Sequence, residues 1–155
     1  MFKRKPVNVE GITVHVYGDK AFVPSKARYE TGLTVDKDPV YISDLKAENV
    51  VSIIENARMA SKEKLPFSAN RDQVIRDAAK PILLATGAKS WKELAKSGIA
   101  YMLIWTDDII TLAISELDKK GRYEYPKSKE RTFSSDTTLI EVVHVILEDV
   151  NSRRN

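Results

Sequence analysis

The stretch Ser90–Ser115, which reads SWKELAKSGIAYMLIWTDDIITLAIS, decides the fold. It opens with a capping box, because Ser90 can accept a hydrogen bond from the amide of Glu93 while the Glu93 carboxylate reaches back to the serine amide. This pattern predicts a short helix over residues 91–96. Gly98 is expected to end that helix in the left-handed conformation, which glycine adopts without steric cost.

Two apolar runs follow the predicted helix, Ile99–Trp105 and Ile109–Ser115. The residues between them, Thr106-Asp107-Asp108, favour a turn, so the runs are predicted to pair as neighbouring strands. Their near-continuous hydrophobicity is typical of central strands that helices cover on at least one face. We therefore expect both strands near the middle of a sheet.

Residues 12–17, near the amino terminus, alternate in character and predict a half-buried strand. Its apolar face comprises Ile12, Val14 and Val16, and its polar face Thr13, His15 and Tyr17. Residues 21–23 and 39–42 predict two further strands. Between residues 50 and 57, apolar side chains recur at helical spacing, which predicts a helix capped by Ser43 or Asp44.

A second helix is predicted to begin at an N-cap pair, Asn70 with Gln73, and Pro81 should kink or split it because proline lacks an amide donor. After the central strands, residues 118–121 predict a turn and residues 122–125 another strand. A closing helix is predicted over residues 140–147, capped by Ser135 or Asp136.

This order of elements shows no regular alternation of strand and helix along the chain. Runs of helices and runs of antiparallel strands favour the α+β class. We predict one domain over residues 1–155, built as a mostly antiparallel sheet with helices packed on one face. A chain of 155 residues is long enough to bury a core of this kind without metal or disulfide support.

Composition narrows the classes of protein that fit. Hydrophobic residues make up 43% and charged residues 30%, which is typical of a globular protein, and no apolar run approaches the length of a membrane span. The basic start, Lys3-Arg4-Lys5, is not followed by the apolar segment of a signal peptide. The chain has no cysteine, which excludes disulfides and thiolate ligands. A cytoplasmic location is the expectation.

Residue chemistry by itself does not indicate an enzyme. The two histidines, His15 and His144, have no partner at metal-ligand spacing, so structural or surface roles are expected for both and no metal site or cofactor is predicted. Trp91 and Trp105 are expected to anchor the core. A metal-dependent nuclease is a minor alternative, in which Asp108 would act with Asp118-Lys119-Lys120.

Nucleic-acid binding is a second alternative. The net charge is +3, and the predicted hairpin around residues 118–131 is rich in lysine and arginine. Tyr123 and Tyr125 could stack on bases while Lys119, Lys120 and Arg122 hold phosphates. Cross-strand aromatic packing beside a solvated charged turn explains the same residues more simply, so nucleic-acid binding stays a minor alternative.

The residues Thr86-Gly87-Ala88-Lys89-Ser90-Trp91-Lys92-Glu93, the strand pair Ile99–Ser115 and the helix Ser135–Asp149 resemble, in order and character, the immunity proteins of bacterial contact-dependent growth inhibition systems. The resemblance covers roughly the carboxyl-terminal half of the chain. It implies a cytoplasmic binding protein without catalytic activity. The implied partner is the toxic carboxyl-terminal domain, often a nuclease, of a cell-surface exoprotein, and no small-molecule substrate or membrane is implied.

Inhibitors of nucleases are often acidic because a nuclease groove is basic, and the net charge of +3 departs from that expectation. Two possibilities follow. A local acidic patch can bind the toxin, with Asp107, Asp108, Glu116 and Asp118 as the candidate residues. Alternatively, the toxin is itself acidic or is bound away from its groove. The first possibility is slightly favoured at this stage.

Overall fold

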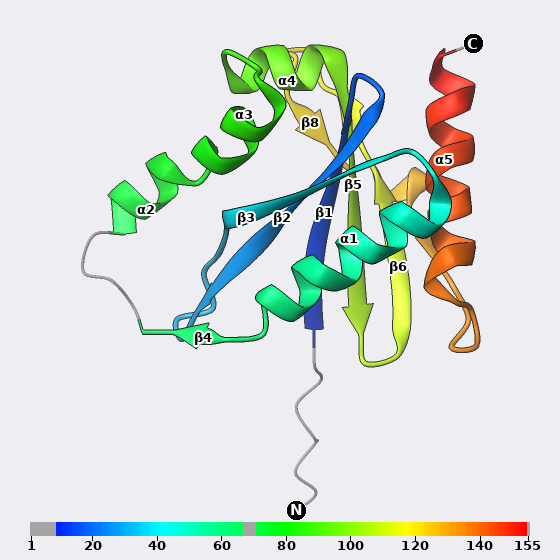
Figure 1. Ribbon diagram of the computed structural model, residues 1–155, viewed down its shortest axis with the longest axis horizontal. Helices are drawn as coiled ribbons and strands as arrows, with labels where there is room; N and C mark the ends of the chain where they lie inside the picture. The colour runs from blue at the N-terminus through cyan, green and yellow to red at the C-terminus, as the bar shows by residue number, and fades with distance from the viewer. Residues whose placement is uncertain (1–8, 67–70, 155) are drawn as a thin grey trace, which may run out of the picture.

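The computed structural model describes residues 9–66 and 71–154. Its main sheet has the strand order β3-β2-β1-β5-β6-β9, and β4 (Lys64–Leu65) pairs with β2 (Figure 1). The other strands are β1 (Val9–Tyr17), β2 (Lys20–Tyr29), β3 (Thr34–Asp44), β5 (Gly98–Thr106), β6 (Ile109–Ile114) and β9 (Arg131–Thr132). A separate small hairpin joins β7 (Glu116–Leu117) to β8 (Tyr123–Glu124).

All the pairings of the main sheet are antiparallel except that of β4 with β2, so the predicted α+β class and mostly antiparallel sheet are confirmed. The predicted strands at 99–105 and 109–115 correspond to β5 and β6. They lie near the middle of the sheet, with β1 on the other side of β5. The strands β2 and β3 extend well beyond the short segments that the sequence pattern predicted.

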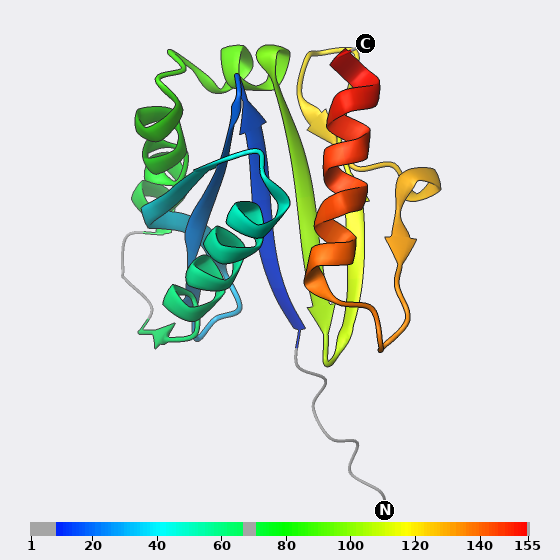
Figure 2. The ribbon, with the colours of Figure 1, turned by 45° about the vertical axis from the view of Figure 1, so that its right-hand side comes forward.

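One face of the sheet carries the main core. The helices α1 (Ala47–Ala60) and α5 (Leu139–Arg154) lie side by side over this face (Figure 2). Because side chains alternate along a strand, β1 sends every second residue towards these helices, and β5 and β6 do the same. The fully buried side chains on this face include Ile12, Val14, Tyr101, Leu103, Leu112, Ile54, Val142 and Ile146.

Polar contacts hold α5 to this face. The Tyr101 hydroxyl donates to Asp149 Oδ2 at 2.6 Å, and the same carboxylate accepts from Arg153 Nε at 2.9 Å. Arg153 also donates to the carbonyl of Ser115 at 2.7 Å, at the end of β6. Burial and the bonded Asp149 carboxylate both raise the pKa of Tyr101, so its hydroxyl stays protonated as a donor.

Three short helices follow one another around the other side of the sheet: α2 (Arg71–Asp77), α3 (Lys80–Thr86) and α4 (Trp91–Ser97) (Figure 1). A second small core joins Phe22 of β2 to Ile82 and Leu94 of these helices. Phe22 points away from the main core because its neighbours Ala21 and Val23 point into it. The prediction placed helices on one face, and the structure adds α3 and α4 on part of the second face.

Local details confirm some predictions and correct others. Pro81 lies in the first turn of α3, so proline splits the helical segment as predicted. Ser90 caps α4 by accepting from the Glu93 amide at 3.2 Å, but the Glu93 carboxylate accepts from the amide of Lys89 instead of that of Ser90. The predicted N-cap Asn70 and the basic segment 3–5 lie outside the described residues.

Gly98 is not left-handed as predicted but extended, with φ −112° and ψ 172°. Glycine is required there for a different reason: a Cβ atom would lie 2.8 Å from the carbonyl oxygen of Leu94 and 3.1 Å from that of Val16. The position is therefore fixed by the close approach of α4 to the start of β5. Among the described residues, no helix is both long enough and apolar enough to cross a membrane.

Candidate binding cleft

The second face of the sheet is only partly covered, and a cleft of about 410 Å³ opens over it. Its floor is formed by β1 and β5, its first wall by the start of α4 and by β3, and its second wall by the segment that contains β8. The residues that line it are Thr13, His15, Asp36, Trp91, Met102, Arg122, Tyr123 and Tyr125. Aromatic rings and a few polar groups converge here, which is the usual make-up of a binding site.

The two walls are held together by hydrogen bonds to the backbone. Trp91 is the first residue of α4, so the Ser90 cap that starts the helix also fixes the position of the indole ring. The Tyr123 hydroxyl donates to the carbonyl of Leu94 at 3.1 Å, which ties the β8 segment to α4. Trp91 and Tyr123 meet edge to face, with ring centroids 6.0 Å apart and an interplanar angle of 90°.

His15 lies beneath these two rings and is 2% exposed. Its ring centroid is 6.0 Å from that of Trp91 and 6.3 Å from that of Tyr123. Among the described residues, neither nitrogen of His15 has a hydrogen-bond partner. Burial lowers the pKa of His15 to about 4, so the imidazole is neutral near pH 7 and retains one donor and one acceptor.

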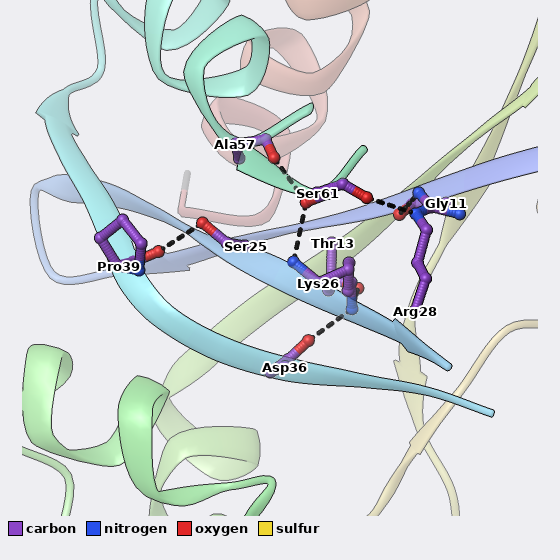
Figure 3. Close-up of polar contacts among 9 residues, drawn as sticks. All are labelled: Gly11, Thr13, Ser25, Lys26, Arg28, Asp36, Pro39, Ala57 and Ser61. Carbon is purple, nitrogen blue, oxygen red and sulfur yellow. Dashed lines mark hydrogen bonds and ion pairs between the residues drawn. The ribbon is translucent and has the colours of Figure 1, made fainter. Parts of the chain in front are cut away.

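A polar cluster lies beside His15 on β1, β2 and β3. The Lys26 ammonium donates to Asp36 Oδ1 at 2.5 Å and to Thr13 Oγ1 at 3.1 Å (Figure 3). The side chains of Lys26 and Asp36 are only 13% and 14% exposed, so this ion pair is largely removed from solvent. Burial, with a smaller effect from the nearby carboxylate of Asp36, raises the pKa of Tyr125 to about 12.

The strand that carries Lys26 is fixed to the end of α1. The Lys26 amide donates to Ser61 Oγ at 2.8 Å, and Arg28 Nε donates to the Ser61 carbonyl at 3.0 Å (Figure 3). The Ser61 hydroxyl in turn donates to the carbonyl of Ala57 in α1. Ser25 donates to the carbonyl of Pro39 at 2.7 Å, where the pairing of β2 with β3 shifts register. The floor and one wall of the cleft are thus held on rigid elements.

The arrangement is suited to recognition. His15 makes no hydrogen bond to a hydroxyl or carboxylate of the described residues, so the nucleophile–base pair of a covalent catalyst is not formed there. The cleft does offer aromatic surface from Trp91 and Tyr123 and a guanidinium group from Arg122, and Lys26 lines an adjoining hollow that shares Asp36 and Trp91 with it. Trp, Tyr and Arg are the residues enriched at the centres of protein interfaces.

The four predicted acidic residues lie in two separate places. Asp107 and Asp108 form the turn between β5 and β6, and Asp107 has a positive φ of 52°. Glu116 and Asp118 lie beyond the other end of β6. That strand has six residues and therefore spans roughly 20 Å. The structure does not bring the four carboxylates together into one patch.

Glu116 and Asp118 are also engaged within the chain. Glu116 forms an ion pair with Lys129. Asp118 accepts from the amides of Lys120 and Arg122 at 2.8 and 2.9 Å and from Arg122 Nε at 3.1 Å. These bonds lower the pKa of Asp118, the amide of Arg122 having the largest effect. Asp118 therefore organises the turn between β7 and β8, a role that the predicted turn at 118–121 already indicated.

The nuclease alternative required Asp108 to act with Asp118, Lys119 and Lys120. Asp108 and Asp118 lie at opposite ends of β6, too far apart to share one metal ion. Within residues 9–66 and 71–154, no group of three or more histidine and acidic side chains is placed to hold a metal ion. For the nucleic-acid alternative, Tyr123 and Tyr125 line the cleft, whereas Lys119 and Lys120 surround a neighbouring hollow with Arg122.

Sequence reasoning missed the residues that build the cleft. The alternation of β1 correctly placed Thr13 and His15 on one side of the strand. That side was expected to face solvent, but Trp91 and Tyr123, from distant segments of the chain, bury His15. Trp105 anchors the main core as expected, but Trp91 is 38% exposed and belongs to the cleft. The sequence did contain one indication of the cleft, namely the position of His15 on the alternate face of a strand near the middle of the sheet.

Comparisons with known proteins concern the fold. No protein-family model matches the chain, and no curated protein matches its sequence. Two solved structures are similar across nearly the whole chain. One is a protein of unknown function from Neisseria meningitidis, with 11% identity, a TM-score of 0.63, and coverage of 92% of this chain and 94% of the other.

The second is a chain of the CdiA-CT/CdiI toxin and immunity complex from Yersinia pseudotuberculosis. It has 13% identity and a TM-score of 0.64, and the match covers 90% of this chain and 94% of that one. At these identities the likeness shows a shared fold. The chain described here therefore has the fold of a chain found in a toxin–immunity complex.

Proposed function

We propose that this chain is an immunity protein: it binds and neutralises the toxic carboxyl-terminal domain, of the nuclease class, of a cognate contact-dependent growth inhibition exoprotein. The observation that carries the proposal is the fold shared with a chain of the Yersinia toxin and immunity complex over 90% of the present chain. The resemblance of the segment around Ser90-Trp91-Lys92 to immunity proteins supports the same assignment from the sequence.

The proposed mode of action is inhibition by binding, without turnover, in the cytoplasm. The sheet, α1 and α5 form a rigid support, and the partly covered second face presents a cleft with aromatic and charged side chains. An interface on such a surface derives its affinity from a few well-packed aromatic anchors and its specificity from complementary charge. The toxin is blocked when the bound protein covers its active site or an adjacent substrate surface.

The acidic residues singled out in the sequence remain part of this proposal as two separate contact points. Asp107 and Asp108 are exposed at the turn between β5 and β6 and are proposed to contact a basic region of the toxin. Glu116 and Asp118 are proposed to contribute less, because each is already paired with a cation of this chain. The double variant Asp107→Asn/Asp108→Asn tests the first contact point by its effect on affinity.

The decisive experiment is co-expression with the toxin domain encoded immediately upstream. We expect the wild-type chain to restore growth to cells that express that domain and to co-purify with it as a stable 1:1 complex. A toxin domain from an unrelated locus is the matched control, because an immunity protein should protect only against its cognate toxin. If growth is not restored and no complex forms, the immunity assignment is wrong for this locus. If the chain alone kills cells, it is itself the toxin.

A further inference from the structure

The segment between β6 and β9 leaves the main sheet and returns to the same edge of it. Its two ends are fixed, because the Ser115 amide donates to the carbonyl of Ala100 at 3.1 Å and the Phe133 amide donates to the carbonyl of Ile110 at 2.9 Å. Between these ends, β7 and β8 pair with each other in a separate two-stranded sheet. We call residues 116–126 the strap, because they form the second wall of the cleft and reach across it to α4.

The strap is organised by bonds within itself. The Asp118 amide donates to the carbonyl of Arg122 at 2.8 Å, and the Asp118 carboxylate accepts from the Arg122 guanidinium. An ion pair between Glu116 and Lys129 links its two ends. None of residues 116–126 is buried, so the strap adds no buried side chain to either core. A segment with so few buried contacts can move as a unit while the rest of the fold stays intact.

One hydrogen bond joins the strap to the opposite wall of the cleft. Within the described residues, this bond runs from the Tyr123 hydroxyl to the carbonyl of Leu94, at 3.1 Å. The Leu94 carbonyl also accepts from the Gly98 amide, so it keeps a partner when the tyrosine moves away. The Tyr123 ring packs against Trp91 and His15 as well. The attachment is therefore weak, since it consists of one neutral hydrogen bond and contacts between rings.

The closed strap leaves His15 in an unfavourable environment. The side chain is 2% exposed, and neither of its ring nitrogens has a hydrogen-bond partner among the described residues. A buried polar atom without a partner costs at least as much free energy as one neutral hydrogen bond contributes. Movement of Tyr123 away from the imidazole lets solvent or a bound partner satisfy these nitrogens. This gain offsets much of the loss of the bond to Leu94, so the closed and open positions of the strap differ little in free energy.

We propose that the strap is a gate that pivots about Ser115 and Pro126. In its closed position Tyr123 bonds to Leu94 and covers His15, and in its open position the floor of the cleft is accessible to the protein partner. The motion is a property of the free chain, whereas its role in partner binding rests on the immunity function proposed above. A partner that binds only the open form has its apparent affinity reduced by the fraction of molecules that are open. The strap therefore sets how fast the toxin is captured.

Chemical modification of His15 in the free chain tests the motion. Diethyl pyrocarbonate acylates a neutral imidazole that it can reach, and mass spectrometry of the digested protein locates the adduct. Because the closed strap encloses His15, its rate of modification is proportional to the open fraction, and the exposed His144 is an internal reference. Tyr123→Phe keeps the ring and removes the bond to Leu94. It should raise the His15 rate about fivefold, the factor expected for one neutral hydrogen bond.

The matched control is Tyr41→Phe. It removes a tyrosine hydroxyl on β3 that lies outside the cleft and makes no hydrogen bond with the described residues, so the His15 rate should not change. Low concentrations of urea separate the motion from global unfolding. Opening of the strap exposes little surface, so the rate should hardly depend on urea, whereas unfolding gives a steep dependence. A steep dependence in the wild type, or equal His15 rates in Tyr123→Phe and the wild type, would overturn the gate.

Stopped-flow association with the purified upstream toxin domain tests the role of the gate in binding. Tyr123→Phe should raise the association rate constant by the same factor as the His15 rate, and Tyr41→Phe should leave it unchanged. If the wild type forms no complex with the toxin domain, the immunity function fails, and the modification rates still decide whether the strap moves. If the complex forms and Tyr123→Phe associates no faster although its His15 rate rises, binding does not require opening and the gating role is wrong.

Discussion

The two faces of the sheet are built from the same strands but differ in purpose. On the first face, Ile12, Val14 and Leu103 meet α1 and α5 in a continuous apolar core. On the second face, the intervening residues Thr13, His15 and Met102 lie beneath a cleft. Because successive side chains of a strand point to opposite sides, one short sequence supports both a core and a binding surface. Substitutions on the two faces should therefore have different consequences.

The largest expected effect on stability comes from the first face. Leu103→Ala removes a fully buried side chain beneath α1 and α5 and should lower the free energy of unfolding by about 3 kcal/mol, because lost burial and a residual cavity both contribute. Urea denaturation measures the change. The fraction that remains folded should bind the toxin domain with wild-type affinity. A loss of affinity in the folded protein would contradict the division between the faces.

The next effect concerns the pH dependence conferred by His15. Its pKa is about 4 when folded and near 6.5 when unfolded, so the unfolded state binds the additional proton between these values. Stability is therefore lost as the pH falls from 6.5 towards 4, by roughly 3 kcal/mol in total. His15→Gln should remove this part of the pH dependence in denaturation curves recorded from pH 4 to 7.

The control for this prediction is the exposed histidine of α5. His144→Gln makes the same substitution at an exposed position outside the cleft. If His15→Gln and His144→Gln give the same curves as the wild type, burial does not keep His15 neutral, and the description of the cleft floor is wrong.

A smaller effect is expected from the polar cluster on the second face. Asp36→Asn leaves Lys26 without its counter-ion in a largely buried position and should lower the free energy of unfolding by about 2 kcal/mol. Asp77→Asn is the comparison, because its ion pair with Lys80 is exposed to solvent, and its effect on the free energy of unfolding should be clearly smaller than that of Asp36→Asn. If the two substitutions destabilise the protein equally in thermal denaturation, the ion pair of Lys26 with Asp36 is as exposed to solvent as an ordinary surface pair.

The smallest effect should come from the helix cap that positions Trp91. Ser90→Ala removes the side-chain acceptor for the Glu93 amide and should lower the free energy of unfolding by about 1 kcal/mol. Ser97→Ala, at the exposed end of the same helix, should change it little. Tryptophan fluorescence of Ser90→Ala should also report a more mobile indole at position 91. An unchanged spectrum and stability would show that the cap does not fix the ring.

The sequence predicted the first face much better than the second. The apolar runs of β5 and β6 and the alternation of β1 are local patterns, and they place Leu103 and Val14 in the core correctly. The capping box predicted the start of α4 for the same reason. The small core around Phe22 was not predicted, because it depends on how α3 and α4 pack after the chain has folded.

The cleft could not be predicted because its residues come from distant parts of the chain. His15, Asp36, Trp91 and Tyr123 are brought together by the strand order of the sheet and by the β8 segment, and nothing local to each residue indicates the others. The predicted acidic patch failed to assemble for a related reason. Asp108 and Asp118 are near in sequence, but the intervening β6 holds them apart.

Hydrogen–deuterium exchange of this chain, with and without its bound toxin domain, tests the central claim most directly, because it reports which face is covered. The account predicts slower exchange at residues 89–97 and 122–125 on binding, with the outer surfaces of α1 and α5 unchanged. Protection confined to α1 and α5 or to the turn at Asp107-Asp108, with residues 89–97 and 122–125 unaffected, would contradict it.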